Sequence, residues 1–208
     1  MTAIATPVSL PYAHLNLRRN PFGELSLGEW AELAVVDVDA VVARLRQRSH
    51  AVQFVGEKGY GKTTHLLAIR SRFPNAAYVH IPEGQRAAVP KSDPALIDEA
   101  QRLTWRQRFT TFRSDVPLVL GTHRDFSREL LRAGRTVETI QVENATNAER
   151  LHQLLNARIE AARRGGGTVP SISWKTVQVL LKKFGPDVRS AIQEMYVTVQ
   201  HLKNIRSV

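Results

Sequence analysis

Between Asp37 and Glu143, short apolar runs alternate with amphipathic segments. The apolar runs are bounded by polar or turn-forming residues, a pattern that predicts strands. These strands are expected at residues 51–55, 75–81, 95–98, 117–121 and 136–142. Helical spacing predicts helices at residues 37–50, 64–71, 100–113 and 126–133. Because strands that alternate with helices favour a parallel sheet covered on both faces, the predicted fold class is α/β with about five strands.

The pattern changes after Glu143. Residues 145–164 are predicted to be helical, a Gly165-Gly166-Gly167 triplet interrupts them, and amphipathic helices follow at residues 173–184 and 187–202. This pattern predicts an α/β domain at residues 1–143 and a small all-helical lid at residues 144–208. Residues 82–94 contain three prolines and little periodicity, so a loop is expected there.

The composition is that of a globular chain. With 208 residues and 43% hydrophobic content, the chain can bury a sizeable core. It has no cysteine, which excludes disulfides and thiolate metal sites and fits a reducing compartment. Residues 1–20 lack a basic start followed by an apolar core, and no apolar run reaches about 18 residues. A cytoplasmic protein without a membrane span is therefore expected.

Basic residues outnumber acidic ones, giving a net charge of +10. From residue 150 onward there are ten basic and three acidic residues, a local excess of +7. Such an excess would attract nucleic acid, acidic proteins or membrane surfaces, and charge alone does not distinguish these partners. The alternative interpretation is a solvated basic helical face.

One motif stands between a predicted strand and a predicted helix. Residues 56–63 match the phosphate-binding pattern G-x-x-x-x-G-K-S/T. Glycines let backbone N–H groups approach an anion, and the helix N-terminus adds partial positive charge. Lys62 is expected to contact the β and γ phosphates of a nucleotide, and Thr63 to bind Mg²⁺. The predicted nucleotide-binding residues of this loop are Gly56, Glu57, Lys58, Gly59, Tyr60, Gly61, Lys62, Thr63 and Thr64.

Polar residues end two further predicted strands. Asp98 is expected to complete the Mg²⁺ shell beside Thr63, and Glu99 to orient or deprotonate the water that attacks the γ-phosphate. The alternative for this pair is a buried strand followed by an acidic helix start. Thr122 is expected to hold the attacking water or a γ-phosphate oxygen, and its alternative is a turn or helix cap.

The order of these motifs resembles that of the AAA+ ATPases over about residues 20–202. The resemblance rests on the phosphate loop, the Asp98-Glu99 strand, the strand ending in Thr122, a further strand, and a basic helical segment containing Gly185-Pro186-Asp187-Val188-Arg189. Residues 95–103 and 118–122 look like the branch that contains transposition helpers, origin-recognition ATPases and secretion-associated ATPases.

The resemblance implies a role for each matching residue. Lys62 and Thr63 correspond to Walker A, and Asp98 and Glu99 to Walker B. Thr122 corresponds to sensor 1. ATP and Mg²⁺ are the implied cofactors, and a homo-oligomer is the implied assembly.

Other implied roles fall on arginines. Arg189 corresponds to the sensor 2 arginine that contacts the γ-phosphate, with a plain surface cation as its alternative. The family also places an arginine finger for the neighbouring subunit just before the fifth strand. Arg135 fits this position best, followed by Arg132 and then Arg128.

The segment Pro21-Phe22 is either an adenine clasp or a core anchor. Two features depart from the family pattern. Residues 82–94 are too few for a crossover helix of the usual size. No DNA-reading helix-turn-helix is expected after the lid, so any DNA contact would come from the ATPase ring or the lid.

Together these observations predict an Mg²⁺-dependent ATPase that acts on duplex DNA through the basic lid and Arg106, Arg108 and Arg113. The alternative is a nucleotide-regulated switch that binds a protein partner with little turnover. A scaffold with a vestigial loop is disfavoured because both Walker motifs are present. A kinase is disfavoured because Glu99 is suited to water and no acceptor domain is evident.

Overall fold

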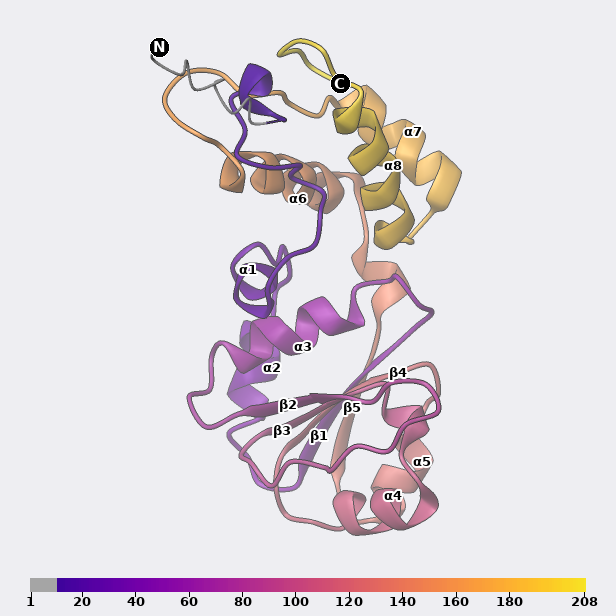
Figure 1. The fold of residues 1–208 in the computed structure, drawn as a ribbon. Helices are drawn as coiled ribbons and strands as arrows, with labels where there is room; N and C mark the ends of the chain where they lie inside the picture. Colours follow the sequence, from indigo (N-terminus) through magenta and orange to yellow (C-terminus); the bar gives the residue numbers. More distant parts are fainter. Residues whose placement is uncertain (1–10) are drawn as a thin grey trace, which may run out of the picture. The chain divides into compact units, whose positions relative to one another are not determined.

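The computed structural model describes residues 11–208, in which five parallel strands form one sheet (Figure 1). The strand order is β2-β3-β4-β1-β5. The strands are β1 (His50–Val55), β2 (Ala77–His80), β3 (Ala95–Asp98), β4 (Leu118–Thr122) and β5 (Thr136–Gln141). The predicted α/β class with a parallel sheet is confirmed.

Side chains from β1, β3 and β4 alternate between two covered faces of the sheet, as the pleat requires. On one face Val52, Leu96 and Val119 pack with residues of α2 (Asp39–Arg44) and α3 (Lys62–Arg70). On the other face neighbouring strand residues pack with α4 (Trp105–Phe112) and α5 (Ser127–Arg132). Two apolar cores therefore hold the strand ends in fixed positions, with helices on both sides (Figure 1).

Two helical segments differ from the prediction because of local capping. The predicted helix at residues 100–113 is split into η2 (Ala100–Arg102) and α4, since the Thr104 side chain caps α4 by accepting from the Gln107 backbone N–H. The short helix α1 (Leu27–Glu32) was not predicted. It begins with a similar capping box between Ser26 and Glu29.

The contacts divide the chain into two compact units. The sheet unit comprises Leu25–Asn147 and Pro186–Arg189, and the described part of the helical unit comprises residues 11–24, Ala148–Gly185 and Ser190–Val208. Residues 11–24 group with the helical unit by their contacts, whereas the sequence analysis placed them in the first domain. Of the predicted first domain, residues 1–10 lie outside the described residues.

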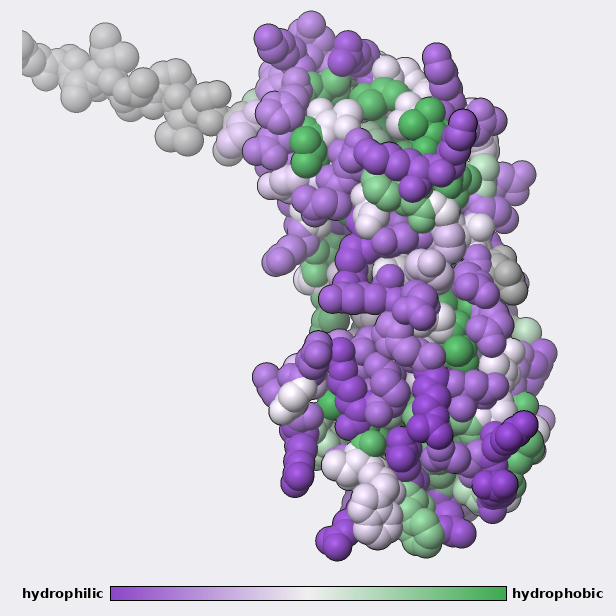
Figure 2. All heavy atoms as spheres, turned by 90° about the vertical axis from the view of Figure 1, so that its right-hand side faces the viewer, coloured by the Kyte–Doolittle hydropathy of each residue, from purple (hydrophilic) through white to green (hydrophobic). Residues whose placement is uncertain are grey.

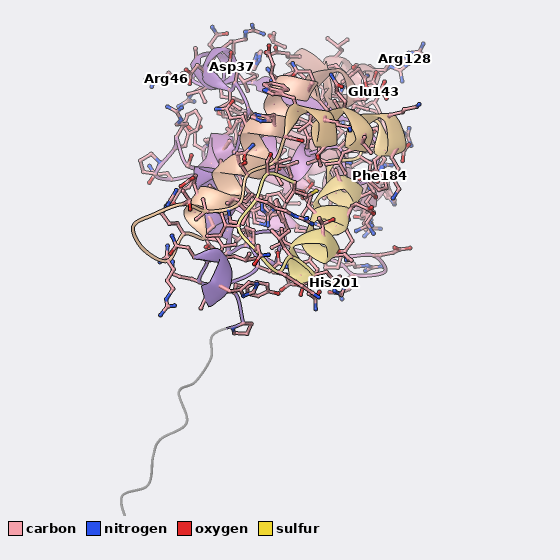
Figure 3. The ribbon with its side chains drawn as sticks, turned by 90° about the horizontal axis from the view of Figure 1, so that it is seen from above. Asp37, Arg46, Arg128, Glu143, Phe184 and His201 are labelled. Atoms are coloured by element: carbon pink, nitrogen blue, oxygen red, sulfur yellow. The ribbon has the colours of Figure 1, made fainter. Side chains whose placement is uncertain are left out.

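The helical unit is built from amphipathic helices whose apolar faces are buried together. It contains η1 (Ala13–Leu15), α6 (Ala148–Ala161), α7 (Trp174–Phe184) and most of α8 (Val188–Gln200); η3 (Val142–Ala145) ends the sheet unit. Phe184 ends α7, and His201 directly follows α8 (Figure 3). The buried apolar residues of these helices are Leu15, Leu151, Leu155, Ile159, Val177, Leu180, Ala191, Met195 and Val199.

The segment around Pro21-Phe22 packs inside the helical unit. The Arg158 guanidinium donates to the Pro21 carbonyl at 2.9 Å and to the Gly23 carbonyl at 2.6 Å. Phe22 is buried, and the Arg158 guanidinium lies 5.9 Å from its ring centroid. Phe22 is therefore a core anchor, one of its two predicted roles. No helix among residues 11–208 has both the length and the apolar character to cross a membrane.

Candidate nucleotide-binding site

The glycine-rich loop connects the end of β1 to the start of α3, as the motif predicts. Gly59 and Gly61 have φ angles of +96° and +88°, a region that residues with a Cβ rarely adopt. A Cβ on Gly59 would also collide with the Asp187 carboxylate. Because Gly61 precedes the first residue of α3, the loop delivers the free N–H groups of the helix N-terminus to the site.

The Lys62 ammonium lies inside this loop. It donates to the Gly56 carbonyl at 2.8 Å and to the Glu57 carbonyl at 2.9 Å. Burial lowers the pKa of Lys62, and the charges of Glu99, Asp98 and Glu57 act in the opposite direction. The loop thus holds a buried cation through two carbonyls, and phosphate oxygens can replace these carbonyls as its hydrogen-bond acceptors.

Asp98 and Thr63 meet at the end of β3. The Thr63 hydroxyl donates to Asp98 Oδ2 at 2.7 Å, and Asp98 is 1% exposed. Tyr78 donates to the same oxygen at 3.0 Å, and its own pKa is raised by burial and by the Asp98 charge. A hydroxyl and a carboxylate are the hard oxygen donors that Mg²⁺ prefers, so this pair fits the predicted metal.

Gly121 on β4 makes room for the Asp98 carboxylate. A Cβ on Gly121 would lie 2.5 Å from Asp98 Oδ1. β3 and β4 pair with Asp98 directly beside Gly121, so a side chain at this position would push the carboxylate away from Thr63.

Glu99 is held by cations and an amide. Its carboxylate accepts from Gln101 Nε2 at 2.8 Å and lies 3.1 Å from the Arg102 guanidinium. Burial raises the pKa of Glu99, but Arg102, His123, Gln101 and Lys62 outweigh it, so the pKa is below its usual value. The Glu99 backbone adopts a left-handed conformation with φ +61°, uncommon for a residue with a Cβ and costing about 1–3 kcal/mol. The site thus holds an ionised carboxylate next to the phosphate loop.

The structure corrects the interpretation of Thr122. This residue is 0% exposed, and its hydroxyl donates to the Arg124 carbonyl at 2.9 Å and accepts from the Arg124 N–H at 3.0 Å. Both hydroxyl contacts close the turn after β4, which is the alternative role that the sequence left open. Thr122 therefore does not present its hydroxyl to the attacking water.

His123 occupies the position expected of Thr122. Its Nε2 lies 3.5 Å from Glu99 and 3.4 Å from Lys62 Nζ, and its Nδ1 lies 3.5 Å from Glu57. The sequence analysis missed this residue because it assigned the polar role to the last residue of the strand. The sequence did contain a signal for His123. It is the first residue after β4, so its side chain can turn toward the phosphate loop.

Arg135 cannot serve as an arginine finger. It is 4% exposed, and burial lowers the pKa of its guanidinium to about 10. The side chain donates to the Phe112 carbonyl at 2.7 Å and to the Ser114 carbonyl at 2.6 Å. Further donations reach the carbonyls of His50, Thr111 and Val116 and the Ser114 hydroxyl. Because its donors bind carbonyls within its own chain, Arg135 is a structural residue.

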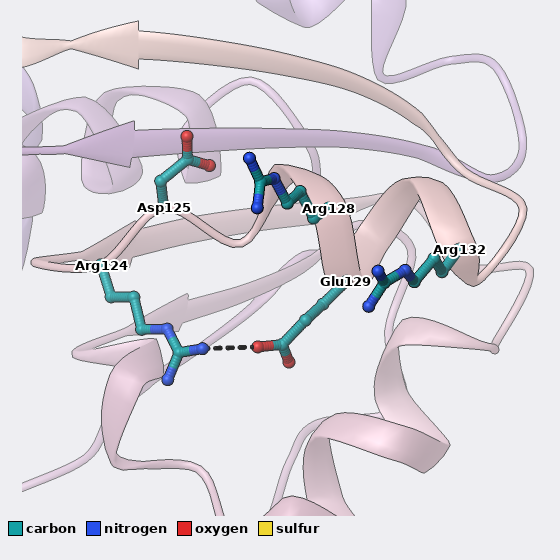
Figure 4. A pocket seen from close by; sticks show the side chains of 5 residues that line it. All are labelled: Arg124, Asp125, Arg128, Glu129 and Arg132. Atoms are coloured by element: carbon teal, nitrogen blue, oxygen red, sulfur yellow. Dashed lines mark hydrogen bonds and ion pairs between the residues drawn. The ribbon is translucent and has the colours of Figure 1, made fainter.

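The other two finger candidates lie at the surface. Arg128 and Arg132 on α5 are exposed and line a pocket with Arg124, Asp125 and Glu129 (Figure 4). Arg124 is held there by an ion pair of 3.0 Å with Glu129. Both finger candidates therefore point outward from the sheet unit, where a partner could reach them.

Arg189 belongs to the sheet unit although it lies in the first turn of α8. It is exposed, and its charge is among those that lower the pKa of Lys62. Its charge therefore acts on the P-loop lysine, and its predicted contact with a γ-phosphate remains a prediction.

The parallel sheet, the phosphate loop after β1 and the Asp98-Glu99 end of β3 together make up an α/β fold with a phosphate-binding loop. The fold is similar to that of RuvB from Thermotoga maritima, a Holliday junction branch migration motor, with a TM-score of 0.53 and 18% identity. A lysine-to-arginine mutant of that RuvB matches with a TM-score of 0.54, also at 18% identity.

The two matches cover 88% and 89% of this chain. They cover 65% and 66% of the RuvB chains, so this chain spans less than two thirds of their length. No protein-family model and no curated protein sequence matches the chain. The likeness to RuvB establishes the fold, and the activity rests on the residues of the site.

Proposed function

We propose that the protein is an Mg²⁺-dependent ATPase that couples ATP hydrolysis to duplex DNA. The observation that carries the ATPase part is the convergence of Lys62, the Thr63–Asp98 pair and Glu99 at one edge of the sheet. Phosphoryl transfer requires little covalent chemistry from the protein, and positioning and charge stabilisation account for most of the catalysis.

Each residue has a role that follows from its contacts. Thr63 and Asp98 would hold Mg²⁺, which neutralises charge on the phosphates when it is bound. Lys62 and the N–H groups of α3 would bind the β and γ phosphates. Glu99, kept ionised by Arg102 and His123, would orient a water molecule and accept its proton.

His123 is proposed as a positioning residue for Glu99. Its ring lies within 3.5 Å of both the Glu99 carboxylate and the Lys62 ammonium. A bound γ-phosphate would replace the Gly56 and Glu57 carbonyls as partners of Lys62, and His123 would keep Glu99 in place during this exchange. His123 would therefore take the sensor 1 role that the sequence analysis assigned to Thr122.

The DNA part of the proposal rests on charge and on the RuvB-like fold. Arg106 and Arg113 on the α4 segment are exposed. Arg108 is not free for DNA, because its guanidinium lies 3.6 Å from Glu129 and 5.6 Å from the Phe126 ring centroid. If subunits assemble as the fold suggests, Arg132 or Arg128 would supply the finger in place of Arg135.

The test is the rate of ATP hydrolysis at low and moderate salt, with and without duplex DNA. Lys62→Ala provides the inactive background, and Arg46→Ala, an exposed arginine outside both the basic lid and α4, is a control for loss of an exposed cation. Stimulation by DNA that fades with added salt would support a DNA-coupled ATPase. Tight ATP binding with neither turnover nor DNA affinity would replace the proposal with the nucleotide-regulated protein switch.

A further inference from the structure

The outer face of α4 carries aromatic side chains that the core does not use. Trp105 is 67% exposed and Phe109 is 56% exposed. They stand four residues apart, so they lie on the same face of the helix, one turn from each other. In Figure 2, pale and green atoms lie beside hydrophilic atoms at the lower end of the sheet unit, where α4 lies. Large exposed aromatics grouped in this way are typical of a binding surface.

Arginines flank both rings. The Arg113 guanidinium lies 4.0 Å from the Phe109 ring centroid, and the Arg106 guanidinium lies 5.4 Å from the Trp105 ring centroid. Such cation–π contacts keep positive charge beside the rings. The segment from Trp105 to Arg113 contains no acidic residue. The surface formed by Trp105, Arg106, Phe109 and Arg113, here named the α4 surface, therefore combines flat apolar groups with positive charge.

We propose that the α4 surface binds single-stranded nucleic acid. A single strand offers phosphates to the arginines and unstacked bases to the two rings, which matches both the charge and the shape of the surface. A duplex offers phosphates but keeps its base faces stacked, so it would use the arginines alone. An acidic protein segment would satisfy the charge but supplies no regular series of flat groups for the rings.

This inference goes beyond the duplex DNA of the proposed function, because it adds a single strand as the ligand of the α4 surface, and that surface needs no ATP hydrolysis. Lys62→Ala is therefore expected to bind a single strand as the wild type does. Loss of ATPase activity with intact strand binding would contradict the proposed function alone. Intact ATPase activity without strand binding would contradict only this inference.

The test compares labelled oligonucleotides by fluorescence anisotropy with the full chain. The probes are a single strand, an abasic strand of the same length, and a duplex. Trp105→Ala and Phe109→Leu should each weaken single-strand binding about 5- to 100-fold and leave abasic-strand binding unchanged, because only stacking is lost. Val179→Ala truncates an exposed apolar residue on α7 and should change neither single-strand affinity nor abasic-strand affinity. Thermal unfolding checks that each variant is folded.

Equal affinity of the wild type for the normal and abasic strands would overturn the inference. So would a change in subunit assembly, measured by light scattering, in Trp105→Ala without a change in strand affinity, because a second copy would then cover the surface. Binding of an acidic peptide that a single strand cannot displace would overturn it in favour of a protein partner.

Discussion

The sheet unit buries two cations, and their surroundings differ. Lys62 follows the carboxyl end of β1, and Arg135 directly precedes the amino end of β5. Because β1 and β5 are parallel neighbours, the two cations lie at opposite ends of the strands. Carbonyl groups satisfy the donors of Arg135, and the charge of Asp115 also acts on its guanidinium. Lys62 is subject to the charges of Glu99, Asp98, Glu57 and Arg189, and it contacts a histidine as well as carbonyls. A buried cation whose donors are satisfied by carbonyls holds the fold, whereas one in a cluster of charges can exchange partners with a ligand.

The largest expected effect is on stability, at Arg135. Arg135→Met should lower the free energy of unfolding by about 3–5 kcal/mol, because several buried carbonyls lose their donors. Urea unfolding measures this loss, and Arg132→Ala, which removes an exposed arginine of α5, should change stability by less than about 0.5 kcal/mol. Nucleotide affinity of the folded fraction should be unchanged, since Arg135 lies at the amino ends of the strands, opposite the phosphate loop. A matching loss in both variants would remove the distinction between the two cations.

The next effect concerns the space beside Asp98. Gly121→Ala should lower ATP turnover about tenfold or more, because its Cβ would displace the carboxylate that pairs with Thr63. The matched control is Gly134→Ala, where a Cβ would meet no atom within 4 Å, although its φ of +82° carries a strain cost. Turnover per folded molecule at saturating Mg²⁺ distinguishes the two. Equal turnover would mean that the carboxylate can move without loss.

A smaller effect is expected at His123. His123→Ala should reduce kcat about tenfold with little change in KM for ATP, since the ring positions Glu99. His123→Asn, which keeps a hydrogen-bonding side chain, should recover part of the rate. Thr122→Val should lower stability instead, by about 1 kcal/mol, because it removes the turn contacts with Arg124. A rate loss in Thr122→Val at unchanged stability would restore the sensor role to Thr122.

The smallest effect is a pH dependence at His50. Burial lowers the pKa of His50, with Glu138 raising it and Arg44 lowering it further. The unfolded chain therefore binds this proton first, so stability falls as pH drops through the unfolded value of about 6.5 toward the folded one. His50→Leu should flatten this fall in chemical unfolding between pH 7.5 and 5.5 (about the range where histidine titrates). An unchanged slope would exclude His50 as the source.

The strands, the phosphate loop and the Asp98-Glu99 pair were predictable because local patterns encode them. Buried strands appear as apolar runs, and the loop needs its glycines at fixed positions. The helix α1 was missed because it has six residues and depends on its capping box rather than on a long periodic pattern. The sequence analysis also predicted one continuous helix at residues 100–113, because periodicity does not show that Thr104 caps a new helix within it.

The role of Thr122 depends on a local turn with Arg124, which the sequence analysis offered as its alternative. The roles of His123 and Arg135 depend on contacts with residues distant in the sequence. Whether Thr122 or His123 faces Glu99 depends on where β4 ends and on the turn to Arg124. Arg135 precedes a strand, as a finger would, but its partners are carbonyls of residues 111–116 that only the folded sheet brings near. The position of a residue in the sequence therefore predicted which strand end it lies near, and its contacts in the folded protein determined its role.

The central claim is that the protein hydrolyses ATP at the carboxyl ends of β1 and β3, and that Glu99 orients the attacking water. The most direct test is single-turnover ATP hydrolysis by Glu99→Gln, with nucleotide binding measured on the same samples. The account predicts hydrolysis reduced about 100-fold or more, with ATP still bound. Hydrolysis by Glu99→Gln at the wild-type rate would contradict it.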